Sequence, residues 1–407
     1  MGLNLALSSR QVRRWESEDP PWPQPPYRRV LEELFGVPAT ELGFTAPTRG
    51  LGPRGATAPT PIIGTITIRP PLAQGVPAFL SDLHSVEADD LLWAADAAQT
   101  ETSTIAALWA SIENYWALDD RFGGKVLRPA IIGQLRYVEG LLHSAPDSRM
   151  EFELRAILQE FYRLAGWTHF DSRKFDAAKR YFAKAAILAR DIQDWPFMAN
   201  VLACMSLQAT YEEKPADALA LVHEAKDISR STATPRINAM LSMREAFAHA
   251  VLKDSGACHR ALADSHRSFQ SAGDDDRDPP WALYFDETKL TVDTGIARGQ
   301  LGEHRPAGEL IGQALVREDE GNTRVRAFHQ LWLATTHFQA GDLEQACRVA
   351  EQATRSAGHL DSLRISDHID GFRTLVLPMS AEKPVAQFLA AAAQIRPADQ
   401  TTPELTP

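Results

Sequence analysis

Apolar residues recur at helical spacing along most of the chain, from about residue 77 to residue 378. Spacings of three and four residues place apolar side chains on one face of a helix. The pattern is interrupted by clusters of glycine, proline and aspartate, which end helices and favour turns. These breaks fall at 123–124, 145–147, 194–196, 214–215, 273–280 and 341–342. The pattern therefore predicts an all-α fold.

A set of mostly small residues repeats through this helical region at steps of about 40 residues. The five sets are Gly166, Ala178, Phe182 and Ala185; Ser206, Ala218, Val222 and Ala225; Ala246, Cys258, Leu262 and Ser265; Gly295, Ala307, Ile311 and Ala314; and Ala334, Ala346, Ala350 and Ala353. Two antiparallel helices approach closely only where small side chains meet. A fixed period of this length is typical of helical solenoids. The alternative is an alanine-rich helical protein that matches by chance, and five coincident sets disfavour it.

The same pattern divides the chain into five predicted segments. They are a partial helical domain (1–46), a linker (47–80), a helical segment for which degenerate repeats are one interpretation (81–150), the repeats (151–378), and a terminal helix with a disordered tail (379–407). Within the linker, residues 62–68 alternate between apolar and small residues, which fits either a short strand or irregular structure.

Charge is distributed unevenly between these segments. The net charge is -11, yet residues 1–50 contain equal numbers of basic and acidic side chains. An acidic chain is not attracted to nucleic acid by its overall field. The composition therefore allows DNA binding only through a small module at the N-terminus.

Other function classes lack a sequence signal. The three cysteines are far apart and form no CxxC pair, so we expect buried, reduced thiols and no zinc site. Neither a membrane-spanning run nor a signal peptide is present, which favours a cytoplasmic protein without membrane contact. We find no catalytic motif, metal cluster or cofactor motif, and we expect no enzyme. The acidic run at 274–278 favours a solvated turn.

The repeat resembles the tetratricopeptide consensus, in which a small residue on the first helix is followed by Ala, an aromatic residue and Ala on the second. The first set, with Gly166, Ala178, Phe182 and Ala185, matches it most closely. Residues 7–16, 22–25, 31–38 and 41–43 resemble the latter half of a Cro/repressor-type (XRE) helix-turn-helix domain. The whole chain resembles actinobacterial regulators that join such a domain to tetratricopeptide repeats, an architecture similar to that of peptide-sensing RRNPP regulators.

This resemblance implies roles for the N-terminal arginines. A recognition helix would span residues 9–16, with Ser9, Arg10 and Arg14 facing the major groove of duplex DNA. Arg13, Arg28 and Arg29 would neutralise phosphates. The alternative is that these arginines form a solvated helix face without a DNA role. The family domain has five helices, and only seven residues precede Ser8. Either the start codon was assigned too late or the domain has decayed.

The repeats suggest a second site. In tetratricopeptide folds the first helix of each pair lines a concave groove that binds extended peptides or partner helices. On the register of this chain, that face offers Arg163, Asn200, Met243, Phe247, Leu331 and Phe338. The alternative is that these residues close the superhelix and bind nothing.

These observations favour a transcriptional regulator with a DNA-binding head and a repeat domain that senses a peptide or protein. Ligand binding would change superhelix curvature or the association of a homodimer. The alternative is a protein-interaction scaffold that has lost DNA binding, and such a scaffold would bind its partner equally well without residues 1–46.

Overall fold

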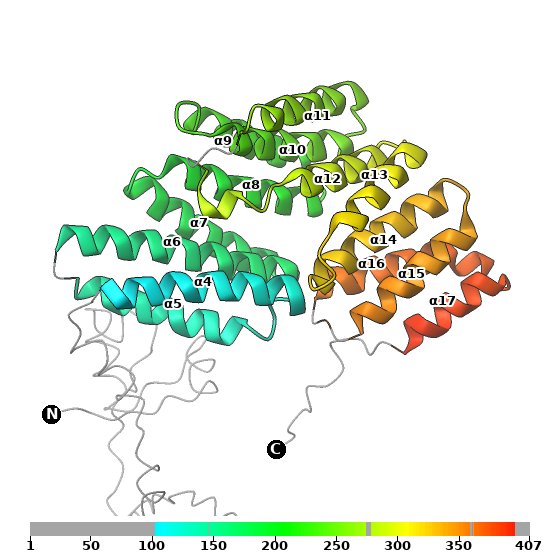
Figure 1. Ribbon diagram of the computed structural model, residues 1–407, viewed down its shortest axis with the longest axis horizontal. Coiled ribbons are helices and arrows are strands. Elements are labelled where there is room, and N and C mark those ends of the chain that lie inside the picture. The colour runs from blue at the N-terminus through cyan, green and yellow to red at the C-terminus, as the bar shows by residue number, and fades with distance from the viewer. Residues whose placement is uncertain (1–101, 146, 274–277, 359, 361, 395–407) are drawn as a thin grey trace, which may run out of the picture. The chain divides into compact units, whose positions relative to one another are not determined.

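The computed structural model describes residues 102–145, 147–273, 278–358, 360 and 362–394, all within a compact unit that spans residues 83–407. Every regular element among these residues is a helix, and consecutive helices pack as an α-solenoid (Figure 1). The predicted all-α solenoid is therefore confirmed for this part of the chain. The expected helix-turn-helix segment (1–46) and the linker (47–80) lie outside the described residues.

The helices have the following bounds. They are α4 (Thr102–Phe122), α5 (Arg128–His143), α6 (Ser148–Asp171), α7 (Phe175–Asp191), α8 (Trp195–Tyr211), α9 (Pro215–Ile228), α10 (Pro235–Val251), α11 (Ser255–Gln270), η2 (Pro280–Ala282), α12 (Glu287–Gln300), α13 (His304–Arg317), α14 (Thr323–Gln339), α15 (Leu343–Ala357), α16 (Leu363–Val376), η3 (Leu377–Met379) and α17 (Lys383–Ala393).

Five consecutive helix pairs carry the predicted register of small residues. The pairs are α6 with α7, α8 with α9, α10 with α11, α12 with α13, and α14 with α15. Every position of the register is buried. The register is therefore the contact line between the two helices of each pair, as expected from its small side chains.

Two glycines show why this contact line tolerates so little volume. A Cβ atom on Gly166 would lie 2.5 Å from the ring of Phe182, and one on Gly295 would lie 2.7 Å from Cγ1 of Ile311. In the second pair Ser206 takes the glycine's place, and its hydroxyl donates a 2.9 Å hydrogen bond to the backbone oxygen of Ala218. Close approach of the paired helices thus depends on these small residues.

The turn inside each pair has its own periodic feature. Seven residues after the first register position, the backbone adopts a positive φ in all five pairs, at Arg173 (56°), Glu213 (57°), Lys253 (59°), Gly302 (94°) and Gly341 (87°). This left-handed conformation costs a non-glycine residue roughly 1–2 kcal/mol. The first three turns therefore carry backbone strain that the last two avoid.

The two helices of each pair differ in burial. The first helices are buried on most sides: α6, α8 and α10 contact their own partner, the next first helix and the preceding second helix. The second helices bury one stripe, which in α7 consists of Ala178, Phe182, Ala185 and Ala189. The first helices thus form an inner layer and the second helices an outer layer.

The inner layer is closed by the helix that precedes the repeats. Both α4 and α5 pack on α6, and α4 also contacts α14, the first helix of the fifth pair. At the other end, α16 packs on α14 and α17 packs on α15. The first helices therefore form a closed series from α4 through α6, α8, α10 and α12 to α14.

An insertion explains the one long step of the register, between α10 and α12. Residues 278–286, which we call the strap, lead into α12 and pass over the inner layer (Figure 1). The ring of Trp281 packs edge-on against Phe197 of α8, with centroids 6.0 Å apart. Asp278 forms a 2.6 Å ion pair with Arg236 of α10, and its side chain is 2% exposed. The expected solvated turn is therefore wrong for Asp278, because Arg236 neutralises it within the strap.

Candidate ligand-binding face

The closure of the inner layer rests on a buried ionic network. Arg324 of α14 donates to the backbone oxygen of Asp119 at 2.6 Å and to its Oδ2 atom at 2.8 Å. The same guanidinium donates to Oδ1 of Asp120 and to Oδ1 of Asp171, each at 3.2 Å. The guanidinium of Arg364 in α16 lies 3.2 Å from the same Asp171 oxygen. We call these five residues the closure network.

The network is fully buried at its centre. Asp119 and Asp171 are 0% exposed and Arg324 is 3% exposed. Burial alone would lower the pKa of Arg324, but Asp119, Asp171 and Asp120 raise it above its usual value. Burial raises the pKa of Asp119 to about 6, against the opposing effect of Arg324. Each guanidinium therefore has carboxylate partners, and the network links the first and last parts of the solenoid.

A second charged group lies on the inner layer beneath the strap. Arg163 of α6 pairs with Glu160 at 2.9 Å, and its guanidinium lies 4.5 Å from the ring centroid of Trp116 in α4. On α12, Lys289 pairs with Asp293 at 2.5 Å. Each of these charges thus has a partner of opposite sign. Together with Asn200, Cys204, Arg244 and Tyr284, these residues form what we call the inner-face cluster.

Arg244 of α10 differs from every other buried arginine in the described residues. It is 6% exposed, and no carboxylate of those residues lies within 4.0 Å of its guanidinium. Its hydrogen bond is a long one, 3.4 Å from Nη2 to the phenol oxygen of Tyr284 in the strap. Burial alone would lower the pKa of Arg244, but Tyr284 and Asp293 raise it, so the guanidinium stays charged. Buried charges normally have a partner.

Several buried polar atoms of this cluster also lack a partner within the described structure. They include three donors, Nε1 of Trp116, Nδ2 of Asn200 and Nε of Arg244, and one acceptor, Oδ2 of Asp293. Asn200 lies one helical turn from both Phe197 and Cys204 on the same face of α8. Unsatisfied buried groups cost free energy, so each one needs an explanation.

The structure places the six predicted groove residues mostly in the core. Met243 and Leu331 are 0% exposed, and Phe247 belongs to the same hydrophobic cluster. Phe338 is partly buried and packs against Phe372 of α16. Met243, Phe247 and Leu331 therefore pack between helices, whereas Phe338 keeps part of its surface exposed. Arg163 and Asn200, in contrast, belong to the inner-face cluster.

The sequence pattern missed the two most informative arginines of this face. Arg244 follows the predicted Met243 by one residue, and it lies two positions before the small residue Ala246. The equivalent positions in neighbouring pairs hold Cys204 and Asp293. The sequence signal that could have identified Arg244 was therefore its position, two residues before the first register residue of its pair. No local sequence pattern identifies Arg324, because its partners lie on helices that are far away in the sequence.

The predicted DNA contacts cannot be placed. Ser9, Arg10, Arg13, Arg14, Arg28 and Arg29 lie outside the described residues. The DNA-binding hypothesis therefore stays a prediction.

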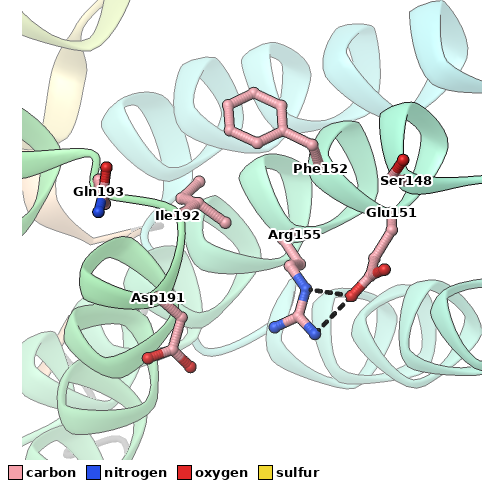
Figure 2. Close-up of a pocket in the computed structure, with 7 residues that line it drawn as sticks. All are labelled: Ser148, Glu151, Phe152, Arg155, Asp191, Ile192 and Gln193. Atoms are coloured by element: carbon pink, nitrogen blue, oxygen red, sulfur yellow. Dashed lines mark hydrogen bonds and ion pairs between the residues drawn. The ribbon is translucent and has the colours of Figure 1, made fainter.

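A surface pocket lies away from both charged groups. It is lined by Ser148, Glu151, Phe152, Arg155, Asp191, Ile192 and Gln193, from the start of α6 and the end of α7 (Figure 2). Figure 2 shows Arg155 and Glu151 pointing toward each other, with two hydrogen bonds of 3.0 and 2.7 Å. The charge of the pocket arginine is thus already neutralised by Glu151.

The described residues contain no group of three or more His, Cys, Asp or Glu side chains arranged to hold a metal ion. In the same part of the chain, no helix combines the length and apolar character that a membrane crossing requires. The three cysteines are all buried and free, as expected. Compared with protein-family models and with curated proteins, the sequence matches none.

Proposed function

We propose that this protein is a transcriptional regulator in which the N-terminal segment binds duplex DNA and the helical solenoid binds a peptide or a protein segment. The solenoid acts as the sensing part, and its closed inner layer is the element that a ligand would alter. The role is binding and not catalysis.

The observation that supports this proposal most strongly is the set of unpartnered polar atoms on the inner layer. Trp116, Asn200, Arg244 and Asp293 come from four different helices, and each leaves one buried polar atom without a partner. Each such atom costs roughly 1–3 kcal/mol when it is left without a partner, and Arg244 adds a buried charge without an ion-pair partner. Main-chain N–H and C=O groups of a bound peptide would satisfy both donors and acceptors.

The DNA-binding half is supported by the sequence alone, through the arginines of residues 9–16 and the helix-turn-helix resemblance. Its test is binding of a labelled duplex from the region upstream of the gene, measured by fluorescence anisotropy across a salt series. The full chain is compared with a chain extended by the in-frame residues encoded upstream. We expect affinity that falls steeply with salt, because phosphate contacts release counterions.

Variants of the N-terminal arginines distinguish sequence-specific binding of DNA from binding that depends only on its phosphates. Arg10→Ala and Arg14→Ala should weaken binding to the upstream duplex more than to a scrambled duplex. Arg13→Ala, Arg28→Ala and Arg29→Ala should weaken both equally and reduce the salt slope. Arg230→Ala, at a highly exposed arginine of the solenoid, is the control. Absence of duplex binding by both the full and the extended chain would reject the regulator and leave an interaction scaffold.

A further inference from the structure

We propose that Arg244 is the anchor for one carboxylate of a peptide that binds the inner-face cluster, and that Asn200 and Tyr284 complete the site. This inference specifies the ligand chemistry of the solenoid, and it rests on the sensing role proposed above.

Charge balance within the cluster is the first argument. Arg163 is neutralised by Glu160, and Lys289 is neutralised by Asp293. Within the described residues this leaves Arg244 as the buried cation of the cluster without an ion-pair partner. A single unmatched positive charge corresponds to a ligand group with a single negative charge. A buried charge is tolerated when it is paired, and a ligand would supply the missing partner.

Hydrogen-bonding capacity is the second argument. The unpartnered Nε atom of Arg244 and Nδ2 atom of Asn200 are donors, which suit the oxygens of a carboxylate. The planar guanidinium matches a carboxylate in a two-bond arrangement. Oδ2 of Asp293 is an unpartnered acceptor in the same cluster, and it suits an amide N–H. Neighbouring carboxylate and amide groups occur together in a peptide.

The nearby carboxylate of Asp293 also argues against a doubly charged ligand group such as a phosphate. Asp293 is 1% exposed and acts electrostatically on Arg244. Like charges repel strongly where water is excluded. A monoanion therefore fits the cluster better than a dianion does.

The partly exposed Tyr284 marks the side from which a ligand would approach the site. Tyr284 is 45% exposed although its phenol group contacts the buried Arg244 and the sulfur of Met240. A ligand carboxylate that displaces the long 3.4 Å contact between Tyr284 and Arg244 would gain a stronger, charge-assisted bond. The phenol O–H, which donates to the sulfur of Met240 in the absence of a ligand, would then turn to the same carboxylate.

The first experiment uses propionate as the probe and thermal unfolding of the full chain as the readout. Melting temperatures are measured in about 200 mM sodium propionate, in sodium chloride of equal ionic strength, and in chloride with propionamide as the uncharged analogue. A ligand that binds only the folded state raises the melting temperature. We expect a rise of about 2–4 °C with propionate alone.

Variants at Arg244 and at a control arginine test whether propionate raises the melting temperature by binding to Arg244. Arg244→Gln should abolish the propionate shift, and Arg244→Lys should retain less than half of it, because lysine keeps the charge without the planar fork. Arg260→Gln, at an exposed arginine of the partner helix α11, should keep the whole shift. Arg244→Lys also provides the comparison if the glutamine variant does not fold. Equal melting temperatures of the wild-type chain in propionate and chloride would overturn the proposal, as would an undiminished shift in the lysine variant.

Short random peptides then identify the source of the carboxylate. One pool has a free C-terminus and no acidic side chains, and the other is amidated at the C-terminus and contains one glutamate per peptide. Stabilisation by the first pool assigns a peptide C-terminus, and stabilisation by the second assigns an acidic side chain. Stabilisation by propionate but by neither pool would refute the peptide. The DNA-binding assay is independent, so failure of the regulator and failure of the carboxylate site are distinguishable.

Discussion

Two buried arginines on the inner layer of this solenoid differ in how many partners their guanidinium groups have. Arg324 donates to three carboxylates and one backbone oxygen, and it joins α14 to α4 and α6. Arg244, at a similar depth, has one long hydrogen bond to a phenol. Since burying an unpaired charge is costly, the contrast separates a group that holds the fold together from one whose partner is absent.

The comparison also separates two ways in which a solenoid can use its inner face. The closure network satisfies its charges with residues of this chain that lie far apart in the sequence, so it contributes to the fold. The inner-face cluster leaves the charge of Arg244 without an ion-pair partner, so it costs stability. Single polar atoms without a hydrogen bond occur in both groups, for example Oδ1 of Asp119 and Nδ2 of Asn200. Loss of stability at a binding site is a common trade-off.

The largest predicted effect concerns Asp171, which accepts from Arg324 and lies 3.2 Å from Arg364. Asp171→Asn should lower the free energy of unfolding by about 3 kcal/mol or more, because two buried guanidinium groups lose a charged partner. Chemical denaturation measures the loss. Asp191→Asn, at a partly exposed carboxylate that ends α7, should change stability by less than about 0.5 kcal/mol. Similar losses in the two variants would contradict the structural role of the network.

A smaller effect is expected at the helix contact that positions the inner-face cluster. Gly166 lies between Arg163 and Trp167 on α6, and an added Cβ would lie 2.5 Å from Phe182. Gly166→Ala should therefore destabilise the chain by about 1–3 kcal/mol. Gly140→Ala on α5 meets no atom within 4 Å and should stabilise its helix by up to about 1 kcal/mol. Equal effects at the two glycines would mean that the pair does not need its close approach.

A pH dependence is expected from His368, which packs against Phe328 and Trp332 beside the closure network. Burial, with Arg364 and Arg173 nearby, lowers the pKa of His368 to about 4. Between pH 6.5 and pH 4 the unfolded chain binds a proton that the folded chain does not, so this residue makes stability fall as the pH falls through that window. The loss from pH 7.5 to pH 5 should be about 1–2 kcal/mol.

The variant His368→Phe isolates that contribution, because phenylalanine keeps an aromatic ring and cannot be protonated. Its stability should decline less than that of the wild type over the same pH range in parallel denaturation curves. Parallel declines in the two proteins would show that His368 is not held neutral by its surroundings.

The smallest effect is expected in the turns. Glu213 adopts a φ of 57° and is exposed, so Glu213→Gly should stabilise the chain by up to about 1 kcal/mol by removing backbone strain. Glu224→Gly, within α9, should destabilise it by about 1 kcal/mol. Neither residue belongs to the closure network or the inner-face cluster, so neither change should alter the response to propionate.

The sequence was sufficient to predict the helix pairs because their contact line is local and repetitive. Gly166, Ser206, Ala246, Gly295 and Ala334 all lie on first helices, with the remaining register positions on second helices. It did not predict the turns at Arg173 and Lys253, because those residues adopt a conformation that favours glycine. The strap was missed because it lies outside the register.

The candidate site could be predicted only in part. Arg163 and Asn200 were predicted on the inner face, but the same register also selected Met243 and Leu331, which pack between helices. Arg244 and Tyr284 meet only because the strap folds back over α10. The closure network depends on contacts between residues about 200 positions apart, which no local pattern encodes.

The most direct test of the contrast between the two arginines is the stability of two uncharged, similarly sized variants, Arg244→Met and Arg324→Met, measured without ligand under the same conditions. The account predicts opposite signs. Arg324→Met should lower the melting temperature, since it leaves Asp119 and Asp171 without their partner. Arg244→Met should raise the melting temperature or leave it unchanged, since it removes a buried charge that has no ion-pair partner within the described structure. A comparable loss of stability in both variants would contradict the claim that Arg244 is held for a ligand.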